Sequence, residues 1–365
     1  MNVGILGAGQ LGRMLALAGY PLGLNFRFYD AAAGAPAGQL SPLTVGSFDD
    51  KAALSRWAAG LDVITYEFEN VPTAAAQHLS TIAPVYPPPT ALFKSQDRIV
   101  EKTFFREQGL PTPEFAAVNS AAECREAIKK IGYPAVLKTR IMGYDGKGQQ
   151  VLRNDGDIEP AFATMKGGHL IVEQFVPFTR ELSIIAARGR DGAVAIYPLA
   201  QNEHGGGILR VSQSPARDVP KATQDQAERH ARAVLSALSY VGVLAIEFFD
   251  VGGRLLANEM APRVHNSGHW SIEGSWTSQF ENQLRAILGW PLGSTEPAGY
   301  SGMVNIIGGL PAEKQVLELG AHLHLYGKEP RPGRKLGHAT VVEDDAAVAA
   351  SRLASLCAVI ERTNC

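Results

Sequence analysis

Short apolar runs alternate with helical patterns in the N-terminal part of the chain, and this alternation limits the possible folds more than any other feature. Residues 3–6, 26–29 and 63–66 have the composition of β-strands, whereas residues 11–18 and 52–59 have helical patterns. Strands separated by helices form parallel sheets, because the chain must cross over before each new strand. We therefore expect a parallel α/β unit at the N-terminus.

Four prolines close together mark the end of this unit. Pro84, Pro87, Pro88 and Pro89 follow the last of these strands. Proline lacks a backbone donor and disfavours helix at the residue before it. The sequence therefore predicts a domain boundary in this region, followed by a helix over residues 95–108.

The middle of the chain has the pattern of an antiparallel α+β region. Strand-like runs follow one another closely between residues 115 and 199. Residues 243–250 and 254–260 predict two strands joined at Gly252-Gly253, which is typical of a β-hairpin. A final module begins near Pro291. The helix before the hairpin is expected to have one apolar face, formed by Ala227, Ala231, Val234, Leu235 and Leu238 at spacings of three and four.

Composition excludes several classes of function. The 34 basic and 36 acidic residues give a net charge of −2, so no overall field favours nucleic acid or an anionic membrane. Three cysteines without a C-x-x-C spacing argue against a disulfide framework and a thiolate zinc site. No apolar run reaches the ~20 residues that span a bilayer, and the start lacks the features of a signal peptide. We expect a cytoplasmic protein that binds neither nucleic acid nor membrane.

The first glycine-rich turn fits a dinucleotide-binding pattern. Gly7, Gly9 and Gly12 have the G-x-G-x-x-G spacing, and Asp30 ends the next predicted strand. An NAD-dependent dehydrogenase is therefore one hypothesis. The physical content is narrower, because such a turn offers the amide N–H groups of a helix N-terminus to any anion. A phosphate, a carboxylate or nothing can occupy it.

A second glycine-rich loop follows a strand that ends in a lysine. Lys138 ends the strand, and residues 143–149 contain three glycines and Lys147. A loop of this kind can fold its backbone over phosphates. Because Gly148 follows Lys147 where a Walker loop has serine or threonine, the loop is of another type. A hairpin loop with incidental charge is the alternative interpretation.

Carboxylates lie in or beside otherwise apolar strands further along the chain. Glu173 belongs to the run at residues 171–176, whose end can offer backbone groups to an adenine edge, with Glu181 near the ribose. Glu247 and Glu259 interrupt the two strands of the predicted hairpin, where burial is costly unless each is paired or binds a cation. Facing each other, they could share Mg²⁺ with ATP oxygens.

The order of these motifs resembles the ATP-grasp superfamily: a lysine strand, a glycine loop, an E-x-x-V strand end and paired carboxylates. Residues 143–149, 261–270 and 331–338 are more closely similar to the signatures of the N5-carboxyaminoimidazole ribonucleotide synthetase family. The A-P-R-x-H-N-S-G-H run is highly specific, and the likeness extends from Gly9 almost to the C-terminus. Met142 is a departure, because many relatives have glycine there.

The resemblance implies both a fold and a reaction. The fold has a Rossmann-like preATP-grasp domain of the biotin-carboxylase type (residues 1–92), an ATP-grasp domain with central and lid subdomains (93–290) and a small β-rich C-terminal domain that completes the substrate site (291–365). The reaction is ATP-dependent carboxylation of 5-aminoimidazole ribonucleotide by bicarbonate in de novo purine synthesis. It releases ADP and phosphate and passes through carboxyphosphate. The family further implies Mg²⁺ and a homodimer.

The resemblance also assigns roles to individual residues. Glu247 and Glu259 would hold Mg²⁺, while Lys328 and Arg334, with Gln10, would bind the ribonucleotide. The carboxylation site would contain Tyr144, Asp145, Arg263, His265 and Asn266. The residues expected to contact ATP are Arg98, Lys138, Gly143, Tyr144, Asp145, Gly146, Lys147, Gly148, Gln149, Glu173, Gln174, Phe175, Val176, Glu181, His204, Asn258 and Glu259.

Alternatives remain for several of these features. His265 and His269 can be packed histidines beside Trp270, and residues 328–335 can form a solvated basic turn. Rival enzymes are formate-dependent glycinamide ribonucleotide transformylase, biotin carboxylase or another ATP-grasp ligase. A nucleotide sensor without turnover would be expected to lack Glu247 or Glu259.

Overall fold

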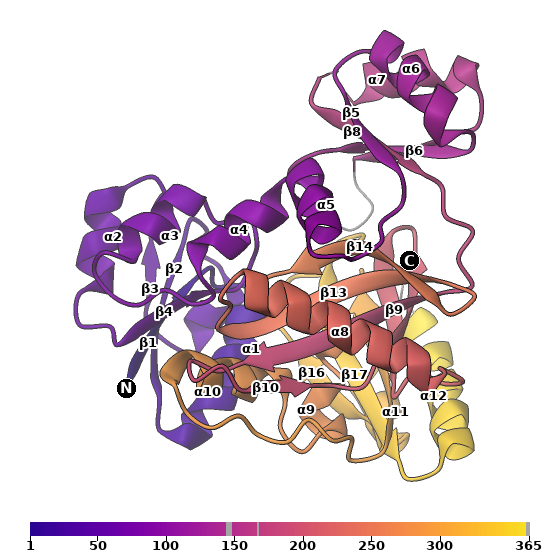
Figure 1. Ribbon diagram of the computed structural model, residues 1–365. Helices are drawn as coiled ribbons and strands as arrows, with labels where there is room; N and C mark the ends of the chain where they lie inside the picture. Colours follow the sequence, from indigo (N-terminus) through magenta and orange to yellow (C-terminus); the bar gives the residue numbers. More distant parts are fainter. Residues whose placement is uncertain (144–147, 166–167, 363–365) are drawn as a thin grey trace.

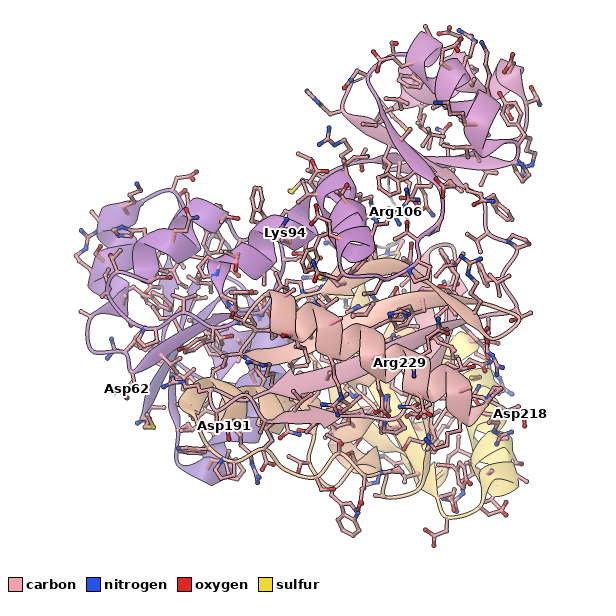
Figure 2. All side chains as sticks on the ribbon, in the orientation of Figure 1. Asp62, Lys94, Arg106, Asp191, Asp218 and Arg229 are labelled. Atoms are coloured by element: carbon pink, nitrogen blue, oxygen red, sulfur yellow. The ribbon has the colours of Figure 1, made fainter. Side chains whose placement is uncertain are left out.

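The computed structural model describes residues 1–143, 148–165 and 168–362, which form three sheets covered by helices (Figure 1). Charged side chains of both signs are spread over the exterior, as the exposed Asp62, Arg106 and Arg229 illustrate (Figure 2). This distribution agrees with the nearly neutral composition. Within the described ranges, none of the helices has the length and apolar character needed to cross a membrane.

The N-terminal sheet is parallel throughout, which confirms the predicted α/β unit. Ile5 and Phe28 are fully buried in it, and Leu284 of the central domain belongs to the same hydrophobic cluster. Helix α1 (Gln10–Gly19) packs against α10 (Gln279–Leu288), so the first domain is fixed to the second through this shared core. The strands lie in the order β3 (Leu43–Val45), β2 (Asn25–Asp30), β1 (Asn2–Leu6) and β4 (Val63–Tyr66).

The largest sheet is antiparallel and extends through the central and C-terminal parts of the chain. Helix α8 (Lys221–Ala237) covers one face of it with the predicted apolar residues, which are buried against β-strand side chains such as Leu244. The strands lie in the order β14 (Arg254–Ala261), β13 (Gly242–Val251), β9 (Arg180–Arg188), β11 (Ala200–Gly205), β12 (Ile208–Ser214), β15 (Tyr300–Ile307), β17 (Lys335–Glu343) and β16 (His322–Leu325), with β10 (Val194–Ile196) beside β9.

The β13–β14 hairpin confirms the sequence interpretation. Its turn contains Gly252 and Gly253 at φ values of 61° and 90°, a conformation that favours glycine. The C-terminal region is β-rich as expected. Its strands continue the largest sheet, because β15 pairs with β12. Helix α12 (Ala346–Glu361) packs on β15 and β17. This continuity brings C-terminal residues to the same cleft as the hairpin.

A third, smaller sheet stands apart from the main body (Figure 1). Helices α6 (Ala121–Ile131) and α7 (Ile158–Thr164) pack on it around a separate core that contains Leu137 and Val172. Beside it lies α5 (Arg98–Glu107), which also contacts β14. The strands lie in the order β5 (Phe115–Val118), β8 (Leu170–Gln174), β6 (Ala135–Thr139) and β7 (Gln149–Leu152).

The helix predicted over residues 95–108 is divided in the structure. Helix α4 (Pro89–Gln96) ends before Asp97, and α5 begins after it. Asp97 has extended backbone angles, and its side chain accepts a hydrogen bond from the Ile99 N–H. It is therefore the N-cap of α5, a role for which aspartate is well suited. Because the helix is interrupted at Asp97, Arg98 at the start of α5 lies in the functional site.

Candidate functional site

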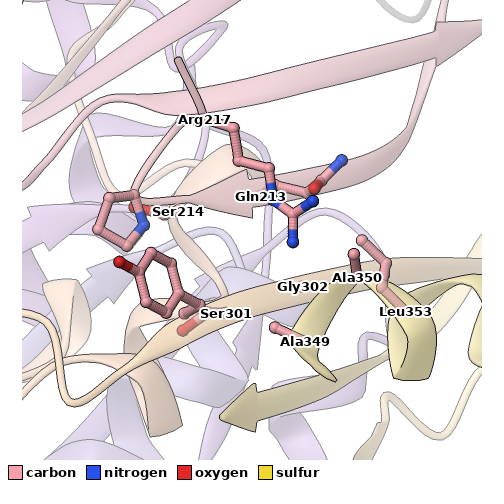
Figure 3. A pocket seen from close by; sticks show the side chains of 10 residues that line it. Gln213, Ser214, Arg217, Ser301, Gly302, Ala349, Ala350 and Leu353 are labelled. Carbon is pink, nitrogen blue, oxygen red and sulfur yellow. The ribbon is translucent and has the colours of Figure 1, made fainter. Parts of the chain in front are cut away.

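A cleft of about 860 Å³ lies where the N-terminal sheet, the β13–β14 hairpin and the C-terminal segment meet. Its volume is typical of small-molecule sites. By contrast, the hollow between β12, β15 and α12 shown in Figure 3 has a volume of about 10 Å³, room for one water at most. Predicted residues that line the large cleft are Gln10, Arg98, Gly143, Glu247, Glu259, Arg263, His265, Asn266, Lys328 and Arg334.

The paired carboxylates face each other as the sequence predicted. Glu247 and Glu259 are directly opposite in the β13–β14 register, so their side chains leave the same face of the sheet. Burial and the nearby charge of Glu259 raise the pKa of Glu247 to about 7. Burial also acts to raise the pKa of Glu259, but the charge of Arg98 outweighs it and the pKa is lowered. Two adjacent carboxylates with this mutual repulsion form a site suited to a cation.

Side chains on one face of α5 bind three consecutive residues of β14. Arg98 Nη1 lies 3.0 Å from Glu259 Oε2, and the Met260 N–H donates to Glu101 Oε1 at 2.7 Å. Lys102 Nζ donates to the backbone oxygen of Asn258 at 2.9 Å. Sequence reasoning found Arg98 but missed Glu101 and Lys102. Their three- and four-residue spacing from Arg98 was the available signal.

Lys138 and Glu173 form a buried ion pair at the base of the small sheet. Lys138 Nζ lies 2.9 Å from Glu173 Oε2, and Lys102 Nζ lies 3.4 Å from the same oxygen. Burial opposes ionisation of Glu173, yet the two lysines lower the pKa of this carboxyl to about 2. Lys138 is also opposite Gln149 at the start of β7, which places the lysine next to the end of the glycine-rich loop.

Four loop residues expected to contact ATP, namely Tyr144, Asp145, Gly146 and Lys147, lie outside the described residues. Gly148 follows with a φ of 70°, and a Cβ there would lie 2.7 Å from Thr139 Oγ1. Met142 has a φ of 59° although it carries a side chain. Glycine adopts this conformation more readily than methionine, which fits the expectation that many relatives have glycine at this position.

A second group of predicted ATP residues lies at the end of β8 and on β9 and β11. Gln174 and Phe175 are exposed where the strand ends, and Val176 is buried beside them. His204 Nδ1 lies 3.0 Å from Glu181 Oε2, joining β11 to β9. Burial would lower the pKa of His204, but its contact with Glu181 raises it. This group does not line the large cleft.

The loop after β14 holds the predicted carboxylation residues. Arg263 contacts Glu69 through Nε and Nη2, both 2.5 Å from Oε2. Burial and the charge of Arg263 hold the pKa of His265 well below its usual value. His265 Nδ1 accepts from the Ser267 N–H at 3.3 Å, and Nε2 lies 3.6 Å from Glu247. His265 therefore lies in the cleft in surroundings that disfavour its charged form.

Asn266 is fixed by Asn305, which the sequence did not identify, and by His269. It exchanges two amide hydrogen bonds with Asn305 of β15, at 3.0 and 2.8 Å. Its Nδ2 also lies 3.0 Å from Nδ1 of His269. His269 is itself buried beside Trp270, as the packed-histidine alternative expected. The C-terminal part of the chain thus positions the loop after β14.

The N-terminal glycine turn is occupied by carboxylates of the chain itself. The Ala8 N–H donates to Asp30 Oδ2 at 2.8 Å, and the Gly12 N–H donates to Glu67 Oε2 at 2.6 Å. Gly9 also donates to Glu67, and a Cβ at Gly9 would lie 2.5 Å from that carboxylate. A dinucleotide phosphate would have to displace Glu67, which argues against the dehydrogenase hypothesis. The sequence missed Glu67, although a carboxylate directly after a buried strand was a usable signal.

Cations from the C-terminal segment also line the cleft. Lys328 Nζ donates to Gln10 Oε1, and Arg331, Arg334 and Lys335 lie around the same opening. Burial and the neighbouring arginine and lysine charges lower the pKa of Lys328 to about 8, although Glu67 opposes the shift. The segment therefore contributes to the cleft wall, with Lys328, Arg334 and Lys335 partly buried, while residues 329–333 are exposed as in a solvated turn. Such a cluster suits a phosphate group.

Three family models match successive parts of the chain. A ribonucleotide synthetase preATP-grasp domain matches residues 1–96, an ATP-grasp domain matches residues 103–280, and a phosphoribosylaminoimidazole carboxylase C-terminal domain matches residues 301–352. The second model covers the small sheet together with β9–β14 of the largest sheet, and the third covers the β15–β17 part of that sheet.

Individual relatives are similar over the whole chain. An N5-carboxyaminoimidazole ribonucleotide synthase of Pseudomonas aeruginosa is 50% identical over 99% of this chain and 100% of its own length. The crystal structure of a synthetase from Thermus thermophilus is 55% identical, with a TM-score of 0.94 and 98% of both chains covered. An Aspergillus clavatus synthase, in complex with ADP and 5-aminoimidazole ribonucleotide, is 33% identical with a TM-score of 0.91, covering 99% of this chain and 98% of that one.

Proposed function

The chain belongs to the N5-carboxyaminoimidazole ribonucleotide synthase family of ATP-grasp ligases, and we propose that its reaction takes place in the cleft described above. This reaction is the ATP-dependent carboxylation of 5-aminoimidazole ribonucleotide in purine biosynthesis. One observation supports this location most strongly. The Glu247–Glu259 pair, the basic segment around Lys328, Arg263 and His265 all line one cleft. Residues suited to a metal ion with phosphate and residues suited to a ribonucleotide therefore line the same cleft.

Phosphoryl transfer comes first in this proposal. A bicarbonate oxygen attacks the γ-phosphorus of ATP, the bond to the ADP oxygen breaks, and carboxyphosphate forms. Lys138 and Arg98, on neighbouring elements, supply positive charge for the phosphate oxygens, and such preorganised charge is the main catalytic resource in phosphoryl transfer. The other residues that the family resemblance assigns to ATP, the first of which is Gly143 and the last Glu259, are likewise proposed as ATP contacts.

Mg²⁺ fits the residues present. Among the described residues no group of three or more His, Cys, Asp or Glu side chains could hold a metal ion by itself. Glu247 and Glu259 supply two carboxylates, and Mg²⁺ is commonly held by one or two carboxylates together with substrate phosphates. When bound, Mg²⁺ would neutralise charge on the phosphate oxygens.

Carboxyl transfer follows at the loop after β14. The substrate amine attacks the carboxyl carbon, the bond to the phosphate oxygen breaks, and phosphate leaves as the amine loses a proton. Because Nδ1 of His265 accepts a backbone hydrogen bond, its Nε2 carries the proton and acts as a donor. We propose that His265 and Arg263 orient the anionic carboxyl donor, with Tyr144, Asp145 and Asn266 completing the site. Lys328, Arg334 and Gln10 would bind the ribonucleotide.

Three further expectations from the family stay proposals. They are a homodimer, a cytoplasmic location, and domain boundaries at residues 1–92, 93–290 and 291–365. Gel filtration with light scattering tests the first of these.

Labelled bicarbonate tests the reaction itself. With ATP and 5-aminoimidazole ribonucleotide present, we expect the label to appear in the carboxylated product, assayed at alkaline pH and low temperature to slow its decarboxylation. The same assay on Arg263→Met should show a large loss. Incorporation at the wild-type level by a folded Arg263→Met protein would remove Arg263 from the site.

A further inference from the structure

Lys102 is a fully buried cation that the proposed reaction does not use. It lies on α5 with 0% of its side chain exposed, and its Nζ donates to the backbone oxygen of Asn258. Lysine is rarely buried to this extent unless its charge is paired. Its ionic partner is Glu173 of β8, 3.4 Å away.

Two lysines share a single carboxylate oxygen here. Glu173 Oε2 lies 2.9 Å from Lys138 Nζ and 3.4 Å from Lys102 Nζ, while Glu173 Oε1 has no hydrogen-bond partner among the described residues. The three side chains differ in access. Lys138 is 11% exposed, Glu173 2% and Lys102 0%, so Lys138 is the member that solvent can reach.

The carboxylate cannot be left without a cation. Despite its burial, Glu173 is held ionised by the two lysines. Removing one partner of a buried ion pair is strongly destabilising, because an uncompensated charge remains in a poorly solvated place. If Lys138 turns to a nucleotide phosphate, Glu173 loses its closer cation. Something else must then neutralise it.

We propose that Lys102 is a positioning residue that keeps Glu173 neutralised when Lys138 exchanges this carboxylate for the phosphates of ATP. Its Nζ is already anchored to Asn258, so it remains beside Glu173 whichever partner Lys138 takes. This inference rests on the proposed role of Lys138 as a ligand of ATP.

The position of α5 explains why this cation is suitable. The same helix face carries Arg98, which binds Glu259, and Glu101, which binds the Met260 N–H. Lys102 thus joins the small sheet to the strand that carries Glu259. Lys102, which neutralises the Glu173 carboxylate, therefore belongs to a helix outside the small sheet.

A double-mutant cycle tests the exchange. Lys102→Met removes the charge at similar volume, and we expect it to raise the KM for ATP at least about tenfold, equivalent to ~1.4 kcal/mol, with a smaller change in kcat. Once Glu173 is also neutral, Lys102 has no charge to balance. Lys102→Met/Glu173→Gln should therefore return the KM for ATP to within a few-fold of Glu173→Gln alone.

Two control variants distinguish a role of Lys102 in ATP binding from a general loss of stability and from a failure of the proposed role of Lys138. Arg188 also donates to a backbone oxygen, that of Tyr240, but it does not line the cleft. Arg188→Met should lower the melting temperature without changing the KM for ATP. Lys138→Met should raise the KM for ATP whether or not Lys102 matters. An unchanged KM in Lys138→Met would refute the premise and the exchange together.

The remaining outcomes concern Lys102 alone. A normal KM for ATP in Lys102→Met, with Lys138→Met impaired, overturns the exchange and leaves the role of Lys138 standing. A double mutant as impaired as Lys102→Met makes Lys102 merely structural and also overturns it. If Lys102→Met does not fold, the comparison of the double mutant with Glu173→Gln decides. Similar constants support the exchange, and a further tenfold rise refutes it.

Discussion

Glu247 and Glu259 lie directly opposite each other across the β13–β14 hairpin, and Arg98 binds only the second of them. The pair is therefore asymmetric. Burial and repulsion raise the pKa of Glu247 to about 7, whereas Arg98 lowers that of Glu259. A shared cation would relieve this repulsion, and Glu259 is the member that is already ionised.

Glu259→Gln should abolish ADP release while the protein stays folded, because it removes charge from the proposed metal site at nearly constant volume. Coupled measurement of ADP release and circular dichroism check the two parts. Glu107→Gln, at the exposed far end of α5, is the matched control and should keep wild-type turnover. Near-normal ADP release by folded Glu259→Gln would remove the proposed metal role.

Lys328→Ala and Arg334→Ala should each weaken binding of the ribonucleotide. A charge-assisted contact is worth roughly 1.5–3 kcal/mol, so the KM for 5-aminoimidazole ribonucleotide should rise about ten- to a hundredfold. The KM for ATP should stay within a few-fold, since other elements are proposed to hold the nucleotide. An unchanged ribonucleotide KM refutes the phosphate contact, and an equal rise in both constants would indicate damaged packing.

The pH dependence of ribonucleotide binding should report Lys328. Its pKa is lowered to about 8, so the free enzyme loses this positive charge as the pH rises through 8 instead of near the usual value for lysine. We expect kcat/KM for the ribonucleotide to fall above pH ~8. Lys328→Arg keeps its charge and should flatten this limb of the profile. A limb that persists unchanged in Lys328→Arg would assign it to another group.

The N-terminal turn should tolerate no side chain at Gly9. A Cβ there would lie 2.5 Å from Glu67 Oε1, so Gly9→Ala must displace the carboxylate that binds the turn. We expect a loss of about 1–3 kcal/mol in the free energy of unfolding. Gly34→Ala is the control, because a Cβ at Gly34 meets nothing within 4 Å. Equal stability of the two variants in urea titrations would contradict the contact.

Local pattern was enough to predict much of the architecture. The Glu247–Glu259 pair followed from two apolar strands and a Gly-Gly turn, because antiparallel pairing sets which side chains share a face. The parallel N-terminal sheet followed from its alternation of strands and helices. The family signatures then supplied the order of the domains and the reaction.

The missed residues are those whose partners are distant in sequence. Glu67 binds Gly9 across 58 positions, Asn305 binds Asn266 across 39, and Lys102 binds Asn258 across 156. Local signals could have marked Glu67 and Lys102 as candidates, but no local pattern encodes their partners, which meet only when separate elements pack together. Met142 was noted only as a departure from glycine, and its positive φ was not predicted.

The central claim is tested most directly by ADP release from the wild-type enzyme with ATP and bicarbonate, with and without 5-aminoimidazole ribonucleotide. If carboxylation occurs in this cleft, ADP should form rapidly only when bicarbonate and the ribonucleotide are both present, and in equal amount to the carboxylated product. ADP formation that is indifferent to the ribonucleotide, or stimulated instead by another amine substrate, would contradict the account.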